Sequence, residues 1–272
     1  MTNATITNFE EIKKRQHQVW SSGDYGKIAW LTVPLGDVLC EAVDLRAGST
    51  VLDVATGTGH VALAAARRFG RVTGIDYVPA LLEVARSRAA AEHLDVAFRE
   101  ADAEDLPFPD DSFDYVFSAI GVMFTADHER TARELVRVSR PGARIGLANW
   151  TPTGFIGQML KIVSGHAPPP PGAMPPTRWG SEETMRELFG AGVTELSFTT
   201  ATVTQRLPSP EFFADFFLQN YGPTLKAAER LSAEGQRALR DELIALAAES
   251  NRASDGTLVC DWEYLVTVAT KV

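Results

Sequence analysis

The sequence predicts an α/β protein built on a mostly parallel sheet with helices on both of its faces. Strand-like and helix-like segments alternate through the first half of the chain, which is typical of parallel strands joined by crossover helices. Four of the five strand-like segments are rich in Val, Ile, Leu and Ala, as expected when helices cover both faces of a sheet. The chain has 272 residues with 45% hydrophobic content, which is enough for one large domain with a sizeable core.

The elements of this first half follow one another in order along the chain. Pro79 suits the first position of a helix, because proline lacks the amide hydrogen that would go unpaired there. Asp127 is the expected N-cap of a later helix. We expect strands over Thr50–Ala55, Arg71–Ile75, Val96–Glu100, Phe113–Ala119 and Ala143–Trp150, and helices over Val61–Phe69, Pro79–His93 and His128–Ser139.

After Trp150 the pattern changes. The segment 151–180 contains the run Pro168–Pro171, which neither a regular helix nor a central strand accommodates, so we expect an irregular excursion over the edge of the sheet. A short helix capped by Ser181 should then end at Phe189. Two β-rich segments follow, Thr194–Gln205 and Leu258–Thr270, and the residues between them predict two or three helices over Ser209–Arg252, with Ser209 as the N-cap.

Composition excludes several classes of protein. The net charge of −9 and the pI near 5.1 oppose non-specific nucleic-acid binding, which needs clustered lysine and arginine. No run of about 18 uncharged apolar residues occurs, so we expect no membrane span, and the polar N-terminus lacks the apolar region of a secretory signal. We therefore expect a cytoplasmic protein. Cys40 and Cys260 lie in apolar contexts, which favours buried free thiols over a disulfide.

A glycine-rich turn follows the first predicted strand. Glycines let the backbone approach a ligand closely, and the helix that begins near His60 offers unpaired amides beside that ligand. Gly57, Gly59 and Ala62 also fit the dinucleotide fingerprint, in which the last position can be alanine. The turn alone therefore leaves two kinds of nucleotide-like ligand open.

Acidic residues separate these two ligands. Asp53, on the strand before the turn, would oppose a pyrophosphate, whose charges favour amides and positive dipoles, and would favour a cation instead. Asp76 ends the second strand, where a carboxylate can accept both ribose hydroxyls. Asp102 follows the third strand and can accept an adenine amino group, while Ala103 leaves room for a flat ring. Because ligands of open α/β sheets bind at the carboxyl ends of the strands, these acids predict an adenosyl ligand with a cationic tail.

These residues and several later motifs resemble a known family. The segment Ala101–Phe108 follows the third strand, Asp111–Val116 leads into the fourth, and Glu134–Gly142 precedes the fifth. With the glycine turn and Asp76, they resemble the class I S-adenosylmethionine-dependent methyltransferases, especially the group similar to the ubiquinone and menaquinone C-methyltransferases. The resemblance covers roughly residues 48–150. One departure is Ala143, where the family usually has a second glycine.

The resemblance implies a Rossmann-like, seven-stranded sheet of order 3-2-1-4-5-7-6 with strand 7 antiparallel, and S-adenosyl-L-methionine as the cofactor, with S-adenosyl-L-homocysteine as its product. It implies a helical segment 1–47 that covers the cofactor and a core 48–272 whose insertions 151–180 and 208–253 form a lid over the acceptor. The residues expected at the cofactor are Trp20, Tyr25, Asp53, Ala55, Thr56, Gly57, Gly59, Asp76, Tyr77, Asp102, Ala103, Glu104, Ser118, Ala119 and Ile120.

Methyl transfer needs alignment and exclusion of water more than a nucleophilic side chain. Accordingly, we find no catalytic triad motif, no metal-ligand spacing and no phosphate-binding Gly-Lys-Ser. His128, after the fourth strand, is the candidate base if the acceptor must lose a proton. A small apolar or aromatic acceptor is expected, because phenylalanines recur at helical spacing near the end of the chain. Its candidate pocket is Met123, Phe124, Trp150, Phe155, Phe213, Phe217 and Tyr221, and the alternative for these aromatics is a core or dimer contact.

Two other functions compete with this interpretation. A nicotinamide-dependent oxidoreductase fits the glycine turn, and Asp53 is the feature that opposes it. A protein that binds S-adenosylmethionine without catalysis fits the turn and the acids equally well, because these residues bind the cofactor rather than perform the transfer. The sequence also leaves the acceptor atom and the oligomeric state open, a homodimer included.

Overall fold

The computed structural model describes residues 8–272, which form a seven-stranded sheet in the order β3-β2-β1-β4-β5-β7-β6. The strands are β1 (Thr50–Val54), β2 (Arg71–Asp76), β3 (Val96–Glu100), β4 (Phe113–Ala119), β5 (Ser139–Trp150), β6 (Val193–Leu207) and β7 (Leu258–Lys271). The first five strands pair in parallel, and β7 runs antiparallel to both β5 and β6. The predicted order and the antiparallel β7 are confirmed.

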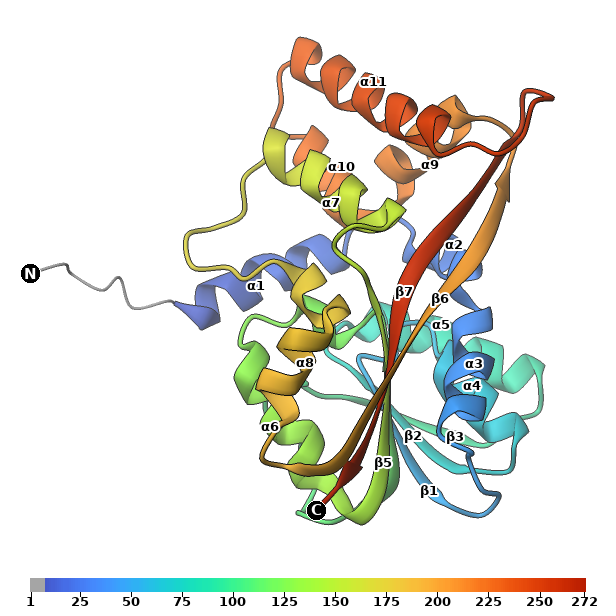
Figure 1. Ribbon diagram of the computed structural model, residues 1–272, viewed down its shortest axis with the longest axis vertical. Coiled ribbons are helices and arrows are strands. Elements are labelled where there is room, and N and C mark those ends of the chain that lie inside the picture. Colours follow the sequence, from blue (N-terminus) through green and yellow to red (C-terminus); the bar gives the residue numbers. More distant parts are fainter. Residues whose placement is uncertain (1–7) are drawn as a thin grey trace, which may run out of the picture.

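Helices cover both faces of the parallel strands. On one side lie α3 (Pro34–Ala42), α4 (His60–Arg67) and α5 (Pro79–Ala91), and on the other lie α6 (His128–Val138) and α8 (Glu182–Phe189) (Figure 1). Asp127 caps α6 by accepting a hydrogen bond from the Arg130 amide at 2.9 Å, and Pro79 begins α5, both as predicted. The carboxyl ends of β1 to β5 lie between these two helical layers. A ligand can reach the sheet at these strand ends.

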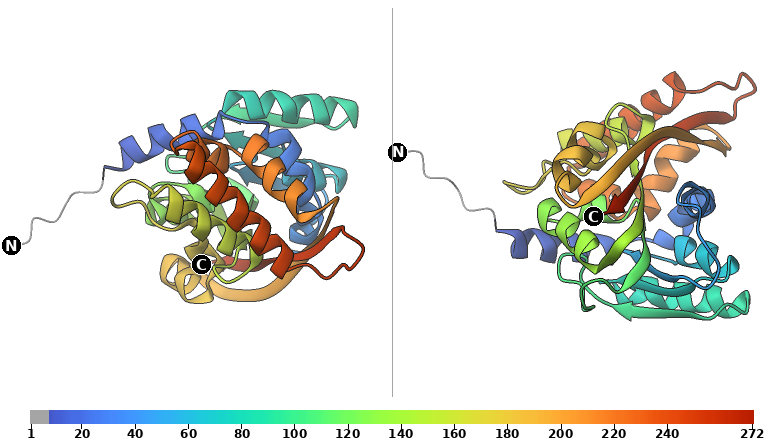
Figure 2. Two further views of the ribbon diagram at one scale, coloured as in Figure 1. Left: turned by 90° about the horizontal axis from the view of Figure 1, so that it is seen from above. Right: turned by 60° about the horizontal axis from the view of Figure 1, so that its bottom comes forward.

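A second group of helices lies beyond those strand ends. It consists of α7 (Phe155–His166), α9 (Pro210–Asn220), α10 (Gly222–Ala228) and α11 (Ala233–Glu249), seen at the top of Figure 1. The long strands β6 and β7 run from the parallel core up to this layer. Figure 2 shows the same layer from above, with α11 lying across the other helices. We call these four helices the upper layer.

The N-terminal helices connect the two parts. α1 (Phe9–Trp20), α2 (Tyr25–Ala29) and the short η1 (Trp30–Thr32) precede α3, and α1 lies between the parallel core and the upper layer (Figure 1). The predicted segment 1–47 therefore begins outside the described residues, because residues 1–7 are not part of the described structure. Its boundary with a core at residue 48 stays a prediction.

One element contradicts the sequence-based expectation. The segment 151–180 was expected to be irregular throughout, but Phe155–His166 forms the helix α7. The proline run begins only at Pro168, beyond the end of α7, and the helix places Phe155, Met159 and Val163 on one buried face. The proline run itself is irregular, and the residues after it lead into the short η3 (Pro176–Gly180).

The other expected strands and helices are present, with shifts of up to four residues at their ends, and Ser181 precedes α8 without a side-chain capping bond. Ser209 caps α9 by accepting a hydrogen bond from the Phe212 amide, as predicted. Cys40 and Cys260 are both free and buried, also as predicted. Within residues 8–272 no helix is long and apolar enough to cross a membrane.

Candidate active site

The loop that follows β1 turns sharply into α4. Ala55, Gly57 and Gly59 all have positive φ, at 53°, 55° and 86°, a region that glycine occupies without the clash of a Cβ atom. A Cβ on Gly59 would lie 3.1 Å from the Cβ of Ala85 and 3.2 Å from the ring of Phe98. Glycine at position 59 therefore allows α4 to begin tight against its neighbours and keeps the loop close to the ends of the strands.

Asp76 at the end of β2 holds this loop in place. Its Oδ2 accepts a hydrogen bond from the Gly57 amide and its Oδ1 accepts one from the Val78 amide, each at 2.9 Å. The carboxyl is 5% exposed, and this burial raises its pKa to about 6 in spite of the amides. At mildly acidic pH the Asp76 carboxyl is therefore partly protonated, which weakens the binding of a ligand that needs the carboxylate.

Asp53 lies behind the loop rather than on its surface. Its Oδ2 accepts hydrogen bonds from the Ala62 amide at 3.0 Å and from the Thr56 hydroxyl, while Oδ1 is buried with no partner in the protein. Burial raises the pKa of Asp53 to about 7. Asp53 thus fixes the shape of the turn and adds a second buried acid beneath it.

The next acids belong to a network with the N-terminal helix. Lys13 on α1 donates to Asp102 Oδ2 at 2.6 Å and lies 2.9 Å from Glu104 Oε2. Glu104 is 2% exposed, and its Oε1 accepts from the backbone amides of Ala126 and Asp127. Lys13 therefore joins α1 to the segment after β3, and Glu104 joins that segment to the start of α6.

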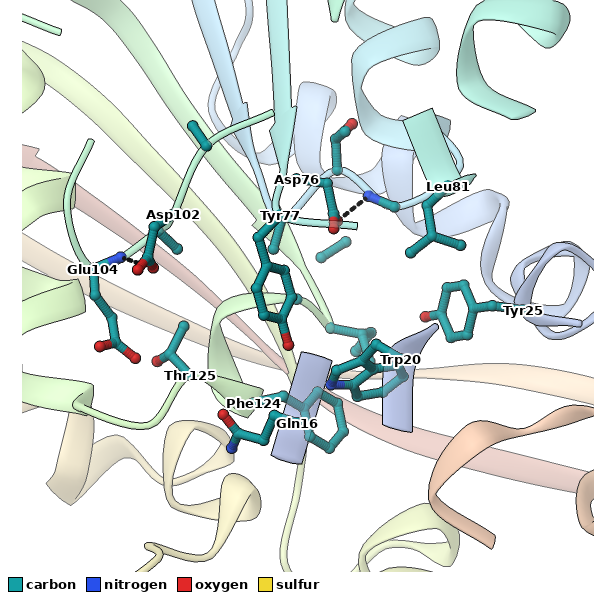
Figure 3. Close-up of a pocket in the computed structure, with 18 of the residues that line it drawn as sticks. Gln16, Trp20, Tyr25, Asp76, Tyr77, Leu81, Asp102, Glu104, Phe124 and Thr125 are labelled. Atoms are coloured by element: carbon teal, nitrogen blue, oxygen red, sulfur yellow. Dashed lines mark hydrogen bonds between the residues drawn. The ribbon is translucent and has the colours of Figure 1, made fainter. Parts of the chain in front are cut away.

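Aromatic side chains form the wall opposite this network. Trp20 lies edge-on to Tyr25, Phe124 and Tyr221, with ring centroids 5.5, 4.8 and 5.8 Å apart. Figure 3 shows Tyr77 between the two groups, with Asp102 and Glu104 on one side of it and Tyr25 on the other. Asp102 and Glu104 thus lie at one end of the cavity and Tyr25 at the other, while Asp76 lies on the Tyr25 side of Tyr77.

These groups line a cavity at the carboxyl ends of the parallel strands that is partly open to solvent, and its empty space, the open mouth included, is about 740 Å³. Its lining includes twelve of the fifteen residues that the sequence places at a cofactor, namely Trp20, Tyr25, Ala55, Thr56, Gly57, Asp76, Tyr77, Asp102, Ala103, Glu104, Ala119 and Ile120. The other three lie just outside the lining. Asp53 and Gly59 support the loop, and Ser118 ties β1 to the turn after β4 by donating to the Val54 carbonyl and accepting from the Val122 amide.

Several lining residues were missed by sequence reasoning. They are Lys13, Gln16, His60, Leu81, Ala101, Gly121 and Thr125. The spacing on α1 is the signal that could have identified two of them. Lys13 and Gln16 lie seven and four residues before Trp20, so they share its face of the helix. His60 follows Gly59 directly, and its burial lowers its pKa to about 4.

The residues expected around the acceptor lie mostly elsewhere. Phe124 lines the cavity, but Met123, Trp150, Phe155, Phe213, Phe217 and Tyr221 are each at most 5% exposed and lie outside its lining. Phe155 and Phe213 pack against Trp262 of β7, with centroids 6.0 and 6.4 Å from the indole. This is the core contact that the sequence left open as the alternative.

His128, the candidate base, also lies outside the cavity lining. It is 1% exposed at the start of α6 and lies edge-on to Trp179, with centroids 5.7 Å apart. Burial lowers its pKa to about 4, so the imidazole is neutral at pH 7.

Comparison with known proteins agrees with this arrangement. Residues 51–142 match a family described as a methyltransferase domain. The chain is 41% identical to an uncharacterized protein of Mycobacterium tuberculosis over the whole of both chains. It is also 41% identical to a demethylmenaquinone methyltransferase of Deinococcus radiodurans over 128 residues, which cover 46% of this chain and 53% of that protein.

The fold has counterparts among solved structures. A putative methyltransferase of Bacillus halodurans superposes with a TM-score of 0.60 at 21% identity, over 86% of this chain and 96% of that one. The glycine loop, the acids at successive strand ends and these similarities lead to one conclusion. The chain belongs to the class I S-adenosylmethionine-dependent methyltransferases and resembles the quinone methyltransferases among them.

Proposed function

We propose that the protein transfers a methyl group from S-adenosylmethionine to a small apolar or aromatic acceptor by in-line displacement. The observation that carries this proposal is a single cavity with a glycine loop, three carboxylates and an aromatic wall. The described lining holds the carboxylates of Asp76, Asp102 and Glu104 and one ammonium group, Lys13, which pairs with Asp102 and Glu104. The remaining negative charge suits a ligand that carries an ammonium and a sulfonium.

The lining residues fit the cofactor part by part. Asp76 would hold the ribose hydroxyls, and Asp102 with Ala103 would hold the adenine. The loop residues Ala55, Thr56 and Gly57 would hold the methionine portion, where Asp53 behind them contributes a buried carboxyl whose Oδ1 has no partner in the protein. Asp53 and Gly59 would then act by shaping the loop, and Ser118 by holding the turn after β4, rather than by contact with the cofactor.

The bound cofactor supplies an electrophilic methyl group on a good leaving group. The chain itself supplies alignment and a dry environment. Trp20 and Tyr25 close the aromatic end of the cavity, where their rings can shield a cation by cation–π contact. Phe124 and Thr125 continue this wall from the turn after β4.

The acceptor would not need a strong base from this cavity. His60 is the imidazole in the described lining, and its lowered pKa of about 4 makes it a weak proton acceptor at pH 7. An acceptor that is already nucleophilic, such as an ionised phenol or an electron-rich ring carbon, fits this environment. His128 as a base stays a prediction.

Calorimetry and an acceptor screen test the proposal. We expect the protein to bind S-adenosylmethionine and S-adenosylhomocysteine, and not NAD(H). With S-adenosylmethionine present, it should produce S-adenosylhomocysteine when mixed with a member of a panel of phenols, naphthols and quinols. Tight NAD(H) binding without S-adenosylhomocysteine binding would overturn the cofactor assignment. Cofactor binding without turnover of any panel member would overturn the proposed acceptor class.

A further inference from the structure

The cavity is acidic, yet one part of the proposed cofactor is an anion. S-adenosylmethionine ends in an amino acid, whose carboxylate is negatively charged at neutral pH. Asp76, Asp102 and Glu104 line the cavity. Asp53 lies buried behind its glycine loop. A carboxylate that moves from water into these surroundings needs hydrogen-bond donors, because an unpaired buried charge is costly. The lining must therefore supply a donor to it.

Lys13 carries the ammonium group of the described lining, but it is engaged elsewhere. Its Nζ lies 2.6 Å from Asp102 Oδ2 and 2.9 Å from Glu104 Oε2. Figure 3 shows these two acids on one side of Tyr77 and Tyr25 on the other. The positive charge of Lys13 therefore belongs to the end of the cavity proposed for adenine, where the two acids already balance it.

The donors of the glycine loop are largely engaged as well. The Thr56 amide donates to the carbonyl of Ile75 at 2.8 Å, and the Thr56 hydroxyl donates to Asp53. The Gly57 amide donates to Asp76 at 2.9 Å. The loop that would hold the methionine portion of the cofactor therefore has few donors left for its carboxylate.

Tyr25, the first residue of α2, lies over this loop. A Cβ on Gly57 would be 3.6 Å from ring carbon Cε1 of Tyr25, so the ring lies close to the loop backbone. Trp20 packs edge-on against the same ring, with centroids 5.5 Å apart, and helps to fix its position. Figure 3 shows the hydroxyl of Tyr25 pointing into the cavity. A donor group thus reaches the methionine side of the cavity from the N-terminal helices.

The Tyr25 hydroxyl is available as a donor. Its burial and the nearby charge of Asp76 raise the pKa of Tyr25 well above the usual range, so the hydroxyl keeps its proton at pH 7. Within residues 8–272 this hydroxyl donates to no other group of the protein. Tyr25 is singled out by its place over the glycine loop, where the cofactor brings its only anionic group.

The start of α4 favours an anion at the same place. The helix begins at His60, three residues after Gly57, and both residues line the cavity. The amide groups in the first turn of a helix carry partial positive charge, which attracts a carboxylate. Tyr25 and the start of α4 thus lie on either side of the space proposed for the methionine portion.

We propose that the Tyr25 hydroxyl donates a hydrogen bond to the carboxylate of the methionine portion of the cofactor. Tyr25 thereby favours S-adenosyl ligands that carry this carboxylate over ligands that lack it. This inference rests on the proposed function, because it assigns a contact to the cofactor of that reaction. It adds a role for the hydroxyl to the cation–π contact of the ring.

Two ligands that differ in the carboxylate test the inference. Isothermal calorimetry on the full chain would compare S-adenosylhomocysteine with its decarboxylated analogue, 5′-deoxy-5′-(3-aminopropylthio)adenosine, which keeps the ammonium group. We expect the wild-type protein to bind S-adenosylhomocysteine more tightly. Tyr25→Phe removes the hydroxyl and keeps the ring. It should weaken S-adenosylhomocysteine binding roughly tenfold and leave the affinity for the analogue within about twofold.

Tyr115→Phe is the matched control, because the Tyr115 hydroxyl donates to the Asp44 carbonyl at 3.2 Å, away from the cavity lining. It should bind both ligands as the wild-type protein does. A Tyr25→Phe variant that loses affinity equally for both ligands, or for neither, would overturn the inference, and so would a wild-type protein that binds the analogue as tightly as S-adenosylhomocysteine. Failure of the wild-type protein to bind either ligand would instead count against the proposed function.

Discussion

Asp76 combines two roles, since it fixes the glycine loop through two backbone amides and lines the cavity. Replacing it by alanine should weaken S-adenosylhomocysteine binding by about 1–3 kcal/mol, the range for losing charge-assisted hydrogen bonds. Isothermal calorimetry measures this. Glu100 pairs with Asp76 in the register of β2 and β3 but is exposed, so Glu100→Ala is the control and should bind normally. Unchanged affinity in a folded Asp76→Ala variant would show that the ribose lies elsewhere.

The raised pKa of Asp76 predicts a pH dependence of binding. With a pKa of about 6, the free protein has this carboxyl mostly protonated at pH 5 and mostly ionised at pH 7. The folded state therefore holds more protons than the unfolded one between about pH 4 and 6, so the contribution of Asp76 to stability falls as the pH rises through this window. Cofactor affinity should rise roughly tenfold between pH 5 and pH 7.

Calorimetry at pH 5, 6, 7 and 8 checks this expectation. Asp76→Asn cannot ionise at this position, so most of the pH dependence should disappear in that variant. An affinity that is the same at pH 5 and pH 7 in the wild-type protein would show that Asp76 binds the ligand equally well in its protonated form.

At the same scale, the sequence predicted the acids and glycines of the cavity but not the residues that reach it from a distance. Asp76 and Asp102 follow strands, so their position at the carboxyl edge is set by local order along the chain. Lys13 lies nearly 90 residues before Asp102, and their contact depends on how α1 packs, which no local pattern encodes.

Among the elements, α1 packs against α10 of the upper layer and is also anchored by residues at the cavity. Ile12 is its one buried residue in the described structure, and its other anchors are Lys13 on Asp102 and Glu104, His17 on the Tyr77 carbonyl, and Trp20. Lys13→Met should loosen α1, raise amide hydrogen exchange over residues 9–20 and speed S-adenosylhomocysteine dissociation severalfold.

Stopped-flow displacement and hydrogen exchange measure these two effects. Lys14 is the matched control, because it is the next residue on the same helix and is exposed. Lys14→Met should leave both rates unchanged. Equal behaviour of the two variants would mean that the Lys13 network does not hold α1 in place.

The elements themselves were largely predictable. β3 and β4 have the expected bounds. The error at α7 had a definite cause, since the proline run at 168–171 was taken to disrupt the whole segment, although it affects only the residues that follow the helix. Prolines limit where a helix can continue and carry no information about residues a full turn earlier.

Across the whole molecule, an aromatic core joins the upper layer to the sheet. Phe213 is fully buried and packs against Phe155, Phe217 and Trp262. Phe213→Ala should lower the free energy of unfolding by about 3–5 kcal/mol, the usual cost of a large cavity. Phe212, the neighbouring residue, is 39% exposed, so Phe212→Ala should cost less than about 1 kcal/mol.

Urea denaturation of the two variants measures both values. A similar small loss in each would show that the upper layer is only loosely attached to the sheet. A large loss in Phe213→Ala with normal cofactor affinity in the folded fraction would confirm that this aromatic group supports the fold rather than the acceptor.

The position of β7 has a consequence for how the chain is made. β7 lies between β5 and β6, although it follows both of them in the chain and residues 208–257 separate it from β6. On the ribosome, β6 is therefore complete while the place beside it is still empty. Its stretch Leu196–Gln205 contains no charged residue, proline or glycine, the features that discourage strands from pairing with other chains. A nascent chain halted before Leu258 exposes both edges of β6. β6 joins the five parallel strands only when β7 inserts between β5 and β6.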